Sequence, residues 1–442
     1  MNKQSKSVLI LGAGMVAGPV VDYLLDNEVP VTVASRTLSK AENLIQAKPQ
    51  GTAKQLNAKN TEALTDAIAQ HDLTISLLPP KFHTKPARIC LEEKKPLVTT
   101  SYVSDEMDDL NEKAEEAGVL LLNEIGLDPG IDHMSAVKTI DEVHQAEGEV
   151  KSFRSYCGAL PAPEESFNPL GYKFSWHPKG VLHASTSSAR FLENGEEIFV
   201  EGENLFTTYE FKHIQGLGYF EQYPNRNSLP YLEKYRIPEA ESIYRGTLRN
   251  IGWCETLKKI VDLGFLSDAG RDFEGTTFKD LTRELLGSCK KPLQTEVINH
   301  LGLDDYSTVM KTLEWLGLFE ENPIPLEQGS PMDALAETME EKLLQGEGER
   351  DMVILQHEFV ARYESKEELI TSTFVDYGEP DGYNSIAKTV GLPAAIATKM
   401  ILEGQIDLTG VHIPVTSEIY EPVLAELEDQ GISFEEKVEE LG

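Results

Sequence analysis

The chain has 442 residues, of which 40% are hydrophobic and 26% charged, the composition of a globular protein rather than of a disordered or fibrous one. This length is enough for two or three hydrophobic cores. The formal net charge is −34, and so acidic a surface repels phosphate backbones and anionic bilayers, so we expect neither nucleic acid nor a membrane as a partner.

The first 125 residues alternate short apolar runs with segments of helical periodicity. Strands are predicted at 7–11, 31–34, 73–77, 97–100 and 119–123, and helices at 16–25, 38–45 and 61–69. Continuous apolar runs of this length are typical of strands covered on both faces. Their alternation with helices predicts an α/β fold with a parallel, doubly wound sheet.

From about residue 150 the pattern changes to strands separated by Gly, Pro and Asn clusters, which indicates an α+β domain. Strands are predicted at 153–158, 180–182, 197–200, 210–213, 352–359 and 370–376. Apolar residues at helical spacing predict helices between 253 and 345, followed by a polar surface connection at 340–351. A further apolar helix is predicted at 392–402, with Pro393 in its first turn.

A glycine-rich turn follows the first predicted strand and opens the first helix. Its sequence is Gly12-Ala13-Gly14-Met15-Val16-Ala17, the G-x-G-x-x-A form of the dinucleotide-binding fingerprint. The first glycine permits the tight turn, the second lets the backbone approach a pyrophosphate, and the small alanine lets the helix pack closely. Main-chain N–H groups at the start of the helix would face the phosphates.

The end of the second strand discriminates between the two nicotinamide cofactors. A site for NAD usually has Asp or Glu there, which accepts a hydrogen bond from the ribose. This chain has Ser35-Arg36-Thr37 instead, and a guanidinium with two hydroxyls suits a 2′-phosphate. Arg36 as an ordinary surface cation is the alternative. We expect NADP(H).

Three further segments fall where ligands bind in open α/β sheets, at the carboxyl ends of strands. They are Leu77-Leu78-Pro79, Thr99-Thr100-Ser101-Tyr102 and Ile125-Gly126-Leu127-Asp128-Pro129-Gly130. Asp128 is either the cap of the helix that follows Pro129 or a ligand contact beside the nicotinamide crevice, and its position favours the contact.

The middle of the chain concentrates arginines in two loop-like segments, Tyr223-Pro224-Asn225-Arg226 and Arg245-Gly246-Thr247-Leu248-Arg249. Such guanidiniums can clamp carboxylates through paired hydrogen bonds, or they can form salt bridges with this acidic chain. Cys157 has two similar alternatives: its thiol either packs as a small hydrophobic group or takes part in function.

The cysteines indicate a reducing compartment. Cys90, Cys157, Cys254 and Cys289 are widely spaced, with no Cys-x-x-Cys pair and no metal-ligand spacing with histidine. The chain has no uninterrupted apolar run of membrane-spanning length and no leader-like segment at its N-terminus. We therefore expect a cytoplasmic protein without a metal.

With these motifs the chain resembles the saccharopine dehydrogenase family. The resemblance covers nearly the whole length, and its most specific segments are Leu160-Pro161-Ala162-Pro163, Tyr223-Pro224-Asn225-Arg226 and Arg245-Gly246-Thr247-Leu248-Arg249. It implies a reversible reaction in lysine metabolism, in which L-glutamate and 2-aminoadipate 6-semialdehyde condense and NADPH reduces the imine to saccharopine.

The resemblance also implies an architecture of three parts in a homodimer. A variant Rossmann domain at 1–126 would be completed by about 390–442. An α+β substrate domain would comprise 127–252 and 350–389, and a helical insertion domain 253–349.

Matched residue by residue, the resemblance places cofactor contacts at Ala13 to Val16, at Ser35, Arg36 and Thr37, at Thr100 and Ser101, and at Leu127, Asp128, Pro129 and Gly130. Gly12 of the glycine turn and Leu78 at its strand end are further candidates for cofactor binding. It places substrate contacts at Ser101, Tyr102, Asp128, Arg226, Thr247, Leu248 and Arg249. Imine formation needs proton transfers, for which Asp128 and Cys157 are the candidate catalytic groups.

Two other functions remain as alternatives. A carboxynorspermidine-type dehydrogenase would join a diamine to an aldehyde, but a diamine calls for acids and aromatic rings rather than paired arginines. The other alternative is a regulator that binds NADPH without catalysis.

Overall fold

The structure is a computed structural model that describes residues 6–46, 48–175, 178–287 and 291–441. It divides into two compact units. The first consists of Met1–Gly148 and Asp381–Glu435, and the second of Glu149–Pro380 and Glu436–Gly442. The two units are described separately below.

The first unit is built on a parallel sheet of seven strands, in the order β17-β6-β5-β4-β1-β2-β3. Its strands are β1 (Val8–Leu11), β2 (Val31–Ser35), β3 (Gly51–Gln55), β4 (Leu73–Ser76), β5 (Leu97–Thr99), β6 (Leu120–Leu122) and β17 (Gly410–His412). All residues of β1 and β4 are buried, as expected of strands covered on both faces. The predicted doubly wound, Rossmann-like sheet is confirmed, and β17, from the C-terminal part of the chain, extends it next to β6.

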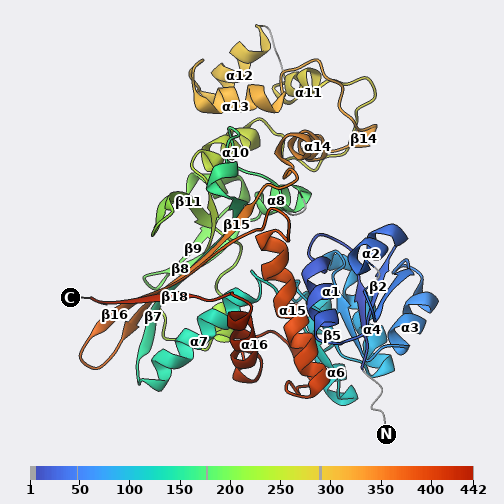
Figure 1. The fold of residues 1–442 in the computed structure, drawn as a ribbon. Helices are drawn as coiled ribbons and strands as arrows, with labels where there is room; N and C mark the ends of the chain where they lie inside the picture. Colours follow the sequence, from blue (N-terminus) through green and yellow to red (C-terminus); the bar gives the residue numbers. More distant parts are fainter. Residues whose placement is uncertain (1–5, 47, 176–177, 288–290, 442) are drawn as a thin grey trace. The chain divides into compact units, whose positions relative to one another are not determined.

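Helices connect these strands and pack on the sheet (Figure 1). They are α1 (Ala17–Asp26), α2 (Leu38–Ile45), α3 (Thr61–Ala69), η1 (Pro80–Phe82), α4 (Thr84–Glu93), α5 (Asp105–Asp108), α6 (Asn111–Ala117), α7 (Ile131–Gln145), α15 (Ser385–Glu403) and α16 (Ser417–Asp429). The bounds of α2 and α3 are those predicted from the sequence.

The first unit extends past the predicted boundary at residue 126, to Gly148. The reason is α7, which buries ten of its fifteen residues and packs against α16 from the C-terminal part of the unit. The hydroxyl of Tyr420 on α16 donates a 2.7 Å hydrogen bond to Oδ2 of Asp141 on α7. These contacts join α7 to the sheet unit rather than to the α+β part.

Helix α15 begins at Ser385, seven residues before the predicted start at Leu392. Oδ1 of Asn384 caps it by accepting a 3.0 Å hydrogen bond from the Ala387 amide. Pro393 therefore lies inside the helix, not in its first turn. By length and composition α15 is apolar enough to span a membrane, but it packs along α1 and is largely buried, as core helices are.

The second unit is built on a mixed sheet of nine strands. The path is β10-β11-β12-β7-β15-β16-β18, and β8 pairs with β12 and β9. Its strands are β7 (Glu149–Pro161), β8 (Ala189–Glu193), β9 (Glu196–Val200), β10 (Glu210–Ile214), β11 (Gly218–Pro224), β12 (Ser242–Arg249), β15 (Asp351–Arg362), β16 (Glu367–Tyr377) and β18 (Glu435–Leu441). Strands β12 and β7 are parallel, so their carboxyl ends lie at the same edge.

Helices of the second unit share one hydrophobic core with this sheet. They are η2 (Pro163–Glu165), α8 (Pro178–Ala184), η3 (Gly202–Thr207), α9 (Tyr231–Lys234), α10 (Trp253–Asp262), α11 (Phe278–Leu285), α12 (Leu293–Leu301), α13 (Thr308–Leu316) and α14 (Pro331–Leu343); a short pair, β13 (Arg271–Asp272) and β14 (Gln328–Gly329), lies among them. The helices predicted within 253–345 are present, and their apolar residues continue the core of the sheet.

The strand predicted at 180–182 is wrong, because these residues lie in α8. Val181 and Leu182 are buried against the helical part of the core, where α8 packs on α14. An apolar run this short does not distinguish a buried helix from a strand.

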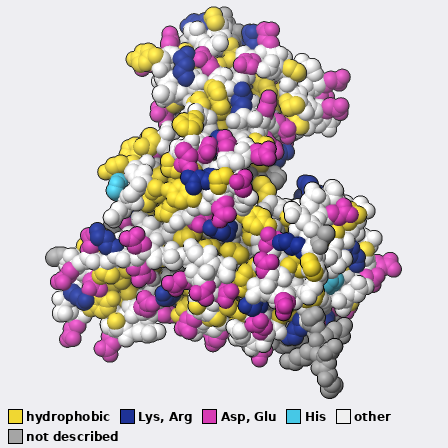
Figure 2. Space-filling view, viewed as in Figure 1, with side chains coloured by type: hydrophobic (Ala, Val, Ile, Leu, Met, Phe, Trp, Pro, Cys, Tyr) yellow, Lys and Arg dark blue, Asp and Glu magenta, His cyan; other side chains and the backbone are white. Residues whose placement is uncertain are grey.

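On the face of the molecule drawn in Figure 2, acidic side chains are distributed rather than gathered in one region. Figure 2 shows Asp and Glu side chains scattered over the visible face, with Lys and Arg between them. Many of these are paired at the surface, such as Lys48 with Asp22 at 2.6 Å and Lys279 with Glu321 at 2.6 Å.

Candidate functional site

In the first unit, the turn between β1 and α1 has the geometry that a dinucleotide needs. Gly12 has φ +119°, and a Cβ added there would lie 2.8 Å from the Leu77 carbonyl oxygen, so only glycine fits. A Cβ added at Gly14 would meet no atom within 4 Å, so that side of the turn is open. Ala17 is fully buried, which lets α1 pack closely. The turn is a cradle that fits a pyrophosphate at the start of a helix.

The neighbouring segment after β2 presents a cation beside this turn. The Thr37 amide donates a 3.3 Å hydrogen bond to the Ser35 hydroxyl, and the carbonyl of Arg36 accepts one of 3.1 Å from Gln55. The backbone of Arg36 is thus fixed while its side chain is exposed. No ion pair involves this guanidinium among the described residues. The donor set fits the 2′-phosphate of NADP(H).

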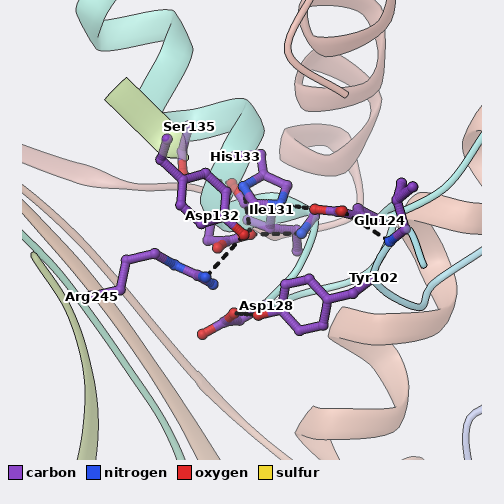
Figure 3. A network of polar contacts seen from close by, with 11 residues as sticks. Tyr102, Glu124, Asp128, Ile131, Asp132, His133, Ser135 and Arg245 are labelled. Atoms are coloured by element: carbon purple, nitrogen blue, oxygen red, sulfur yellow. Dashed lines mark hydrogen bonds and ion pairs between the residues drawn. The ribbon is translucent and has the colours of Figure 1, made fainter. Parts of the chain in front are cut away.

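At the ends of β5 and β6 the structure brings Tyr102 and Asp128 together. The backbones of the two strand ends pair, since the Glu124 amide donates to the Ser101 carbonyl at 3.1 Å. The Tyr102 hydroxyl then donates a 2.7 Å hydrogen bond to Oδ1 of Asp128, and the two side chains face each other in Figure 3. Asp128 does not cap α7, whose N-cap is Gly130. The carboxylate is instead half-buried and paired with a phenol.

A buried group of ionisable side chains lies near this pair (Figure 3). Nε2 of His133 lies 2.8 Å from Oε2 of Glu124, and Oε1 of Glu124 accepts a 3.0 Å hydrogen bond from the Val103 amide. Glu124 therefore connects α7 to the residue after Tyr102. The sequence pattern did not reveal this connection, because Glu124 and Val103 are separated by 21 positions along the chain.

The remaining cofactor candidates of the first unit lie on the same edge of the sheet. The turn at Leu127, Pro129 and Gly130 is tight, since the Gly126 amide donates to the Pro129 carbonyl at 2.9 Å. Leu127 and Pro129 are buried, and Leu78 packs against the hydrophobic core. Thr100 and Ser101 are partly exposed after β5. Because the side chains of Leu78 and Leu127 pack inside the protein, mainly their main-chain atoms can contact a ligand.

In the second unit, one face of the sheet carries three of the predicted site residues. In register, Thr247 of β12 lies between Cys157 of β7 and Tyr223 of β11. Side chains alternate along a strand, so Arg249 is on the same face as Thr247. The sheet thus brings Cys157, Thr247 and Arg249 to one surface. The Leu248 side chain lies on the opposite face in the hydrophobic core, so only its main chain could reach a ligand.

Arg249 is a buried cation without an acidic partner in the described part of the chain. Its side chain is nearly inaccessible; Nη1 donates to the Leu248 carbonyl at 2.8 Å, and Nε has no hydrogen-bond partner. The guanidinium carbon lies 5.1 Å from the ring centroid of Tyr172 and 5.4 Å from that of Trp253. A guanidinium stays charged, and a buried donor without a partner is costly. The site is therefore prepared for an anion.

The acid nearest to Arg249 in register is Glu221 on β11, and it has another role. Its two carboxylate oxygens accept hydrogen bonds of 2.8 and 2.7 Å from the Gly252 and Cys254 amides. This caps the N-terminus of α10, where a negative charge is favoured. Both oxygens of the Glu221 carboxylate are thus hydrogen-bonded to the start of α10.

The other candidates of this unit differ in exposure. Arg226 is exposed, in a turn with φ +55°, where its carbonyl accepts a 2.9 Å hydrogen bond from the Arg190 amide. Arg245 is buried, and its Nη1 donates to the Tyr231 hydroxyl at 3.1 Å. Cys157 is partly exposed, whereas Cys289 lies outside the described residues. No group of three metal-ligating side chains occurs in the described ranges.

Comparison with known proteins identifies relatives of both units. Residues 8–122 match the family model of the saccharopine dehydrogenase NADP binding domain, and residues 126–432 that of the saccharopine dehydrogenase C-terminal domain. The chain is 43% identical to saccharopine dehydrogenase [NADP(+), L-glutamate-forming] of Schizosaccharomyces pombe, over 98% of this chain and 99% of the relative. The Saccharomyces cerevisiae relative of the same name is 42% identical, over 98% and 99%.

A longer relative and a solved structure extend this comparison. The mitochondrial alpha-aminoadipic semialdehyde synthase of Bos taurus is 38% identical over 97% of this chain, which corresponds to 47% of that protein. The apo structure of histidine-tagged saccharopine dehydrogenase (L-Glu forming) from Saccharomyces cerevisiae has a TM-score of 0.90 and 42% identity, over 98% of this chain and 100% of the other.

Proposed function

Because the chain belongs to the saccharopine dehydrogenase family, we propose that it is an NADP(H)-dependent oxidoreductase acting on the CH–NH group of saccharopine. In the reductive direction, the amine of L-glutamate and the aldehyde of 2-aminoadipate 6-semialdehyde lose water to form an imine. Hydride addition to the imine carbon and protonation of its nitrogen then give saccharopine. The reverse reaction oxidises and hydrolyses it, within lysine metabolism.

The observation that carries this function is the buried Arg249 with its unpartnered Nε. Saccharopine has three carboxylates, and in a chain of net charge −34 an anionic substrate needs a local cation to be held. A guanidinium fixed in an aromatic setting, with the nearby Glu221 bound to a helix terminus, supplies that cation. Charge-assisted hydrogen bonds between such a group and a carboxylate are strong and directional.

The first unit supplies the complementary requirements of the reaction. NADPH supplies the hydride when bound. The turn at Gly12 and Gly14 would hold its pyrophosphate, and Arg36 its 2′-phosphate. Tyr102 and Asp128 form a hydrogen-bonded pair that can hold or pass a proton during imine formation and hydrolysis. Cys157 in the second unit is the other candidate for proton transfer.

An assay of both directions tests the function. NADPH oxidation is expected only when glutamate and the semialdehyde are both present, and NADP⁺ reduction is expected with saccharopine. Absence of turnover in both assays rejects the proposal. Tight NADPH binding without turnover of any amine–aldehyde pair would instead favour a regulator.

The carboxynorspermidine-type alternative is not favoured. A diamine is a cation, and a buried guanidinium at Arg249 would repel it. The relatives named above support the same conclusion, since their names specify the L-glutamate-forming reaction.

The assembly and compartment are further parts of the proposal. A homodimer, as the family resemblance implies, predicts a particle of twice the chain mass in sedimentation equilibrium, and a particle of the single chain mass contradicts it. A cytoplasmic location is supported by Cys90 and Cys254, which are buried and form no disulfide, and cell fractionation followed by immunodetection tests it.

A further inference from the structure

His83 is a buried imidazole that connects the ends of two neighbouring strands in the first unit. Its Nδ1 lies 2.8 Å from the Ser76 hydroxyl at the end of β4, and its Nε2 lies 2.9 Å from the Ser101 hydroxyl after β5. The imidazole is 5% exposed, whereas Ser101 is partly accessible. Of the two serines, only Ser101 can therefore meet a ligand.

The imidazole has one N–H and one lone pair available for these two hydroxyls. Burial lowers the pKa of His83 to about 4, so the ring is neutral at physiological pH and one nitrogen donates while the other accepts. Thr99, the last residue of β5, approaches the ring only at 3.4 and 3.5 Å. With both nitrogens engaged, the ring cannot rotate without losing two hydrogen bonds.

We propose that His83 is a positioning residue, which fixes the Ser101 hydroxyl in one orientation for contact with the bound reactants. It acts through Ser101 and does not itself touch them. A free serine side chain exchanges among three staggered rotamers, and holding one of them in advance lowers the cost of ordering it on binding. His83 lies between η1 and α4, outside the dinucleotide-binding motif, so the sequence motif did not point to it.

This inference rests on the proposed function, in which Ser101 contacts the reactants. A double-mutant cycle of His83→Leu and Ser101→Ala tests it, measured as kcat/KM for saccharopine with NADP⁺ saturating. Each single variant is expected to lower kcat/KM about tenfold. The double variant should be no worse than Ser101→Ala alone, because residues that act as one unit are not additive.

His83→Gln provides a rescue, since its amide can reach a hydroxyl from a similar position; it should recover most of the activity. Ser76→Ala keeps the imidazole but removes the hydroxyl that is bonded to its Nδ1. It should lower kcat/KM by a factor of about three, within the range for a neutral hydrogen bond. This variant tests the proposal even if His83→Leu does not fold.

His71 offers a matched control in the same unit. It is also buried with both ring nitrogens bonded, to the Ala67 carbonyl at 2.6 Å and the Thr32 hydroxyl at 2.8 Å, but it precedes β4 at the opposite edge of the sheet. His71→Leu should lower the melting temperature without lowering kcat/KM.

The outcomes separate the two proposals. Absence of turnover by the unsubstituted enzyme rejects the proposed function and this role with it. Normal turnover with an unaffected His83→Leu, or losses that multiply in the double variant, rejects the role of His83 alone.

Discussion

The Tyr102 hydroxyl donates a 2.7 Å hydrogen bond to Oδ1 of Asp128, across 26 positions of the chain. A carboxylate bonded to a phenol can receive a proton and return it without leaving its position. Both residues are at the carboxyl edge of the parallel sheet, where open α/β folds bind their ligands. The pair is therefore the first place to test the chemistry.

Tyr102→Phe should lower kcat for saccharopine oxidation by about 10- to 100-fold, the range for loss of a hydrogen bond to a charged group. NADPH affinity should be unchanged in fluorescence titration. Tyr420→Phe is the matched control, since it removes an equally short bond to Asp141 and should affect stability only. Equal kcat values for Tyr102→Phe and the unsubstituted enzyme would exclude the pair from proton transfer.

Arg249→Ala should raise KM for saccharopine well over tenfold while NADPH still binds, because a charge-assisted pair contributes about 1.5–3 kcal/mol. Initial-rate kinetics measure this. Arg154→Ala is the control, since Arg154 is on the opposite face of the sheet and is paired with Glu193; its KM should stay normal. An unchanged KM in Arg249→Ala would remove this residue from the substrate site.

Arg36→Ala should weaken NADPH binding by about tenfold or more and leave NADH binding nearly unchanged, because only NADPH has the 2′-phosphate. Calorimetric titration with both cofactors gives the comparison. Lys40→Ala removes a neighbouring exposed cation on α2 and controls for the general loss of charge. Equal losses for NADPH and NADH would contradict the assignment of Arg36.

Gly14→Ala should lower NADPH affinity at least tenfold while changing the free energy of unfolding by less than about 0.5 kcal/mol. The added Cβ meets no protein atom within 4 Å but occupies space needed by the pyrophosphate. Gly12→Ala is the contrasting variant, because φ +119° and the Leu77 carbonyl at 2.8 Å oppose a side chain, so it should lose about 1–3 kcal/mol of stability. Undiminished NADPH binding by Gly14→Ala would place the cofactor elsewhere.

The low pKa of His83 predicts a stability loss in acid. Burial holds this pKa at about 4 against 6.5 when unfolded, so between these pH values the unfolded chain binds the extra proton and folding is disfavoured. The contribution is fully present above pH 6.5 and is lost as the pH falls toward 4. Urea unfolding at pH 7.5 and 5.0 should show a smaller difference for His83→Gln than for the unsubstituted protein, and equal differences would contradict this origin.

Much of the first unit was predictable because its signals are local. Apolar runs and helical periodicity predict β1, β2, β4, β5 and β6 and the ends of α2 and α3, but not β3 or β17. The glycine turn is recognisable within six residues. The absence of an acid at the end of β2 predicts Arg36 as the contact for a 2′-phosphate. These features depend on backbone geometry and on residues only a few positions apart, so they can be recognised in the sequence itself.

Other features depend on contacts between distant residues, and only the tertiary structure decided them. The sequence leaves open whether Arg249 pairs with an acid or binds an anionic ligand; the register of β11 with β12 and the capping of α10 show that Glu221, the acid opposite Arg249, is bonded to the helix instead. The sequence also leaves Asp128 open between a helix cap and a ligand contact; the structure excludes the cap, since the N-cap of α7 is Gly130, and pairs the carboxylate with the Tyr102 hydroxyl. The membership of α7 in the first unit was decided by packing on α16, and the bridging position of His83 by the folding of β4 beside β5. Long-range packing fixes such partners, and no local pattern of residues encodes which of them will meet.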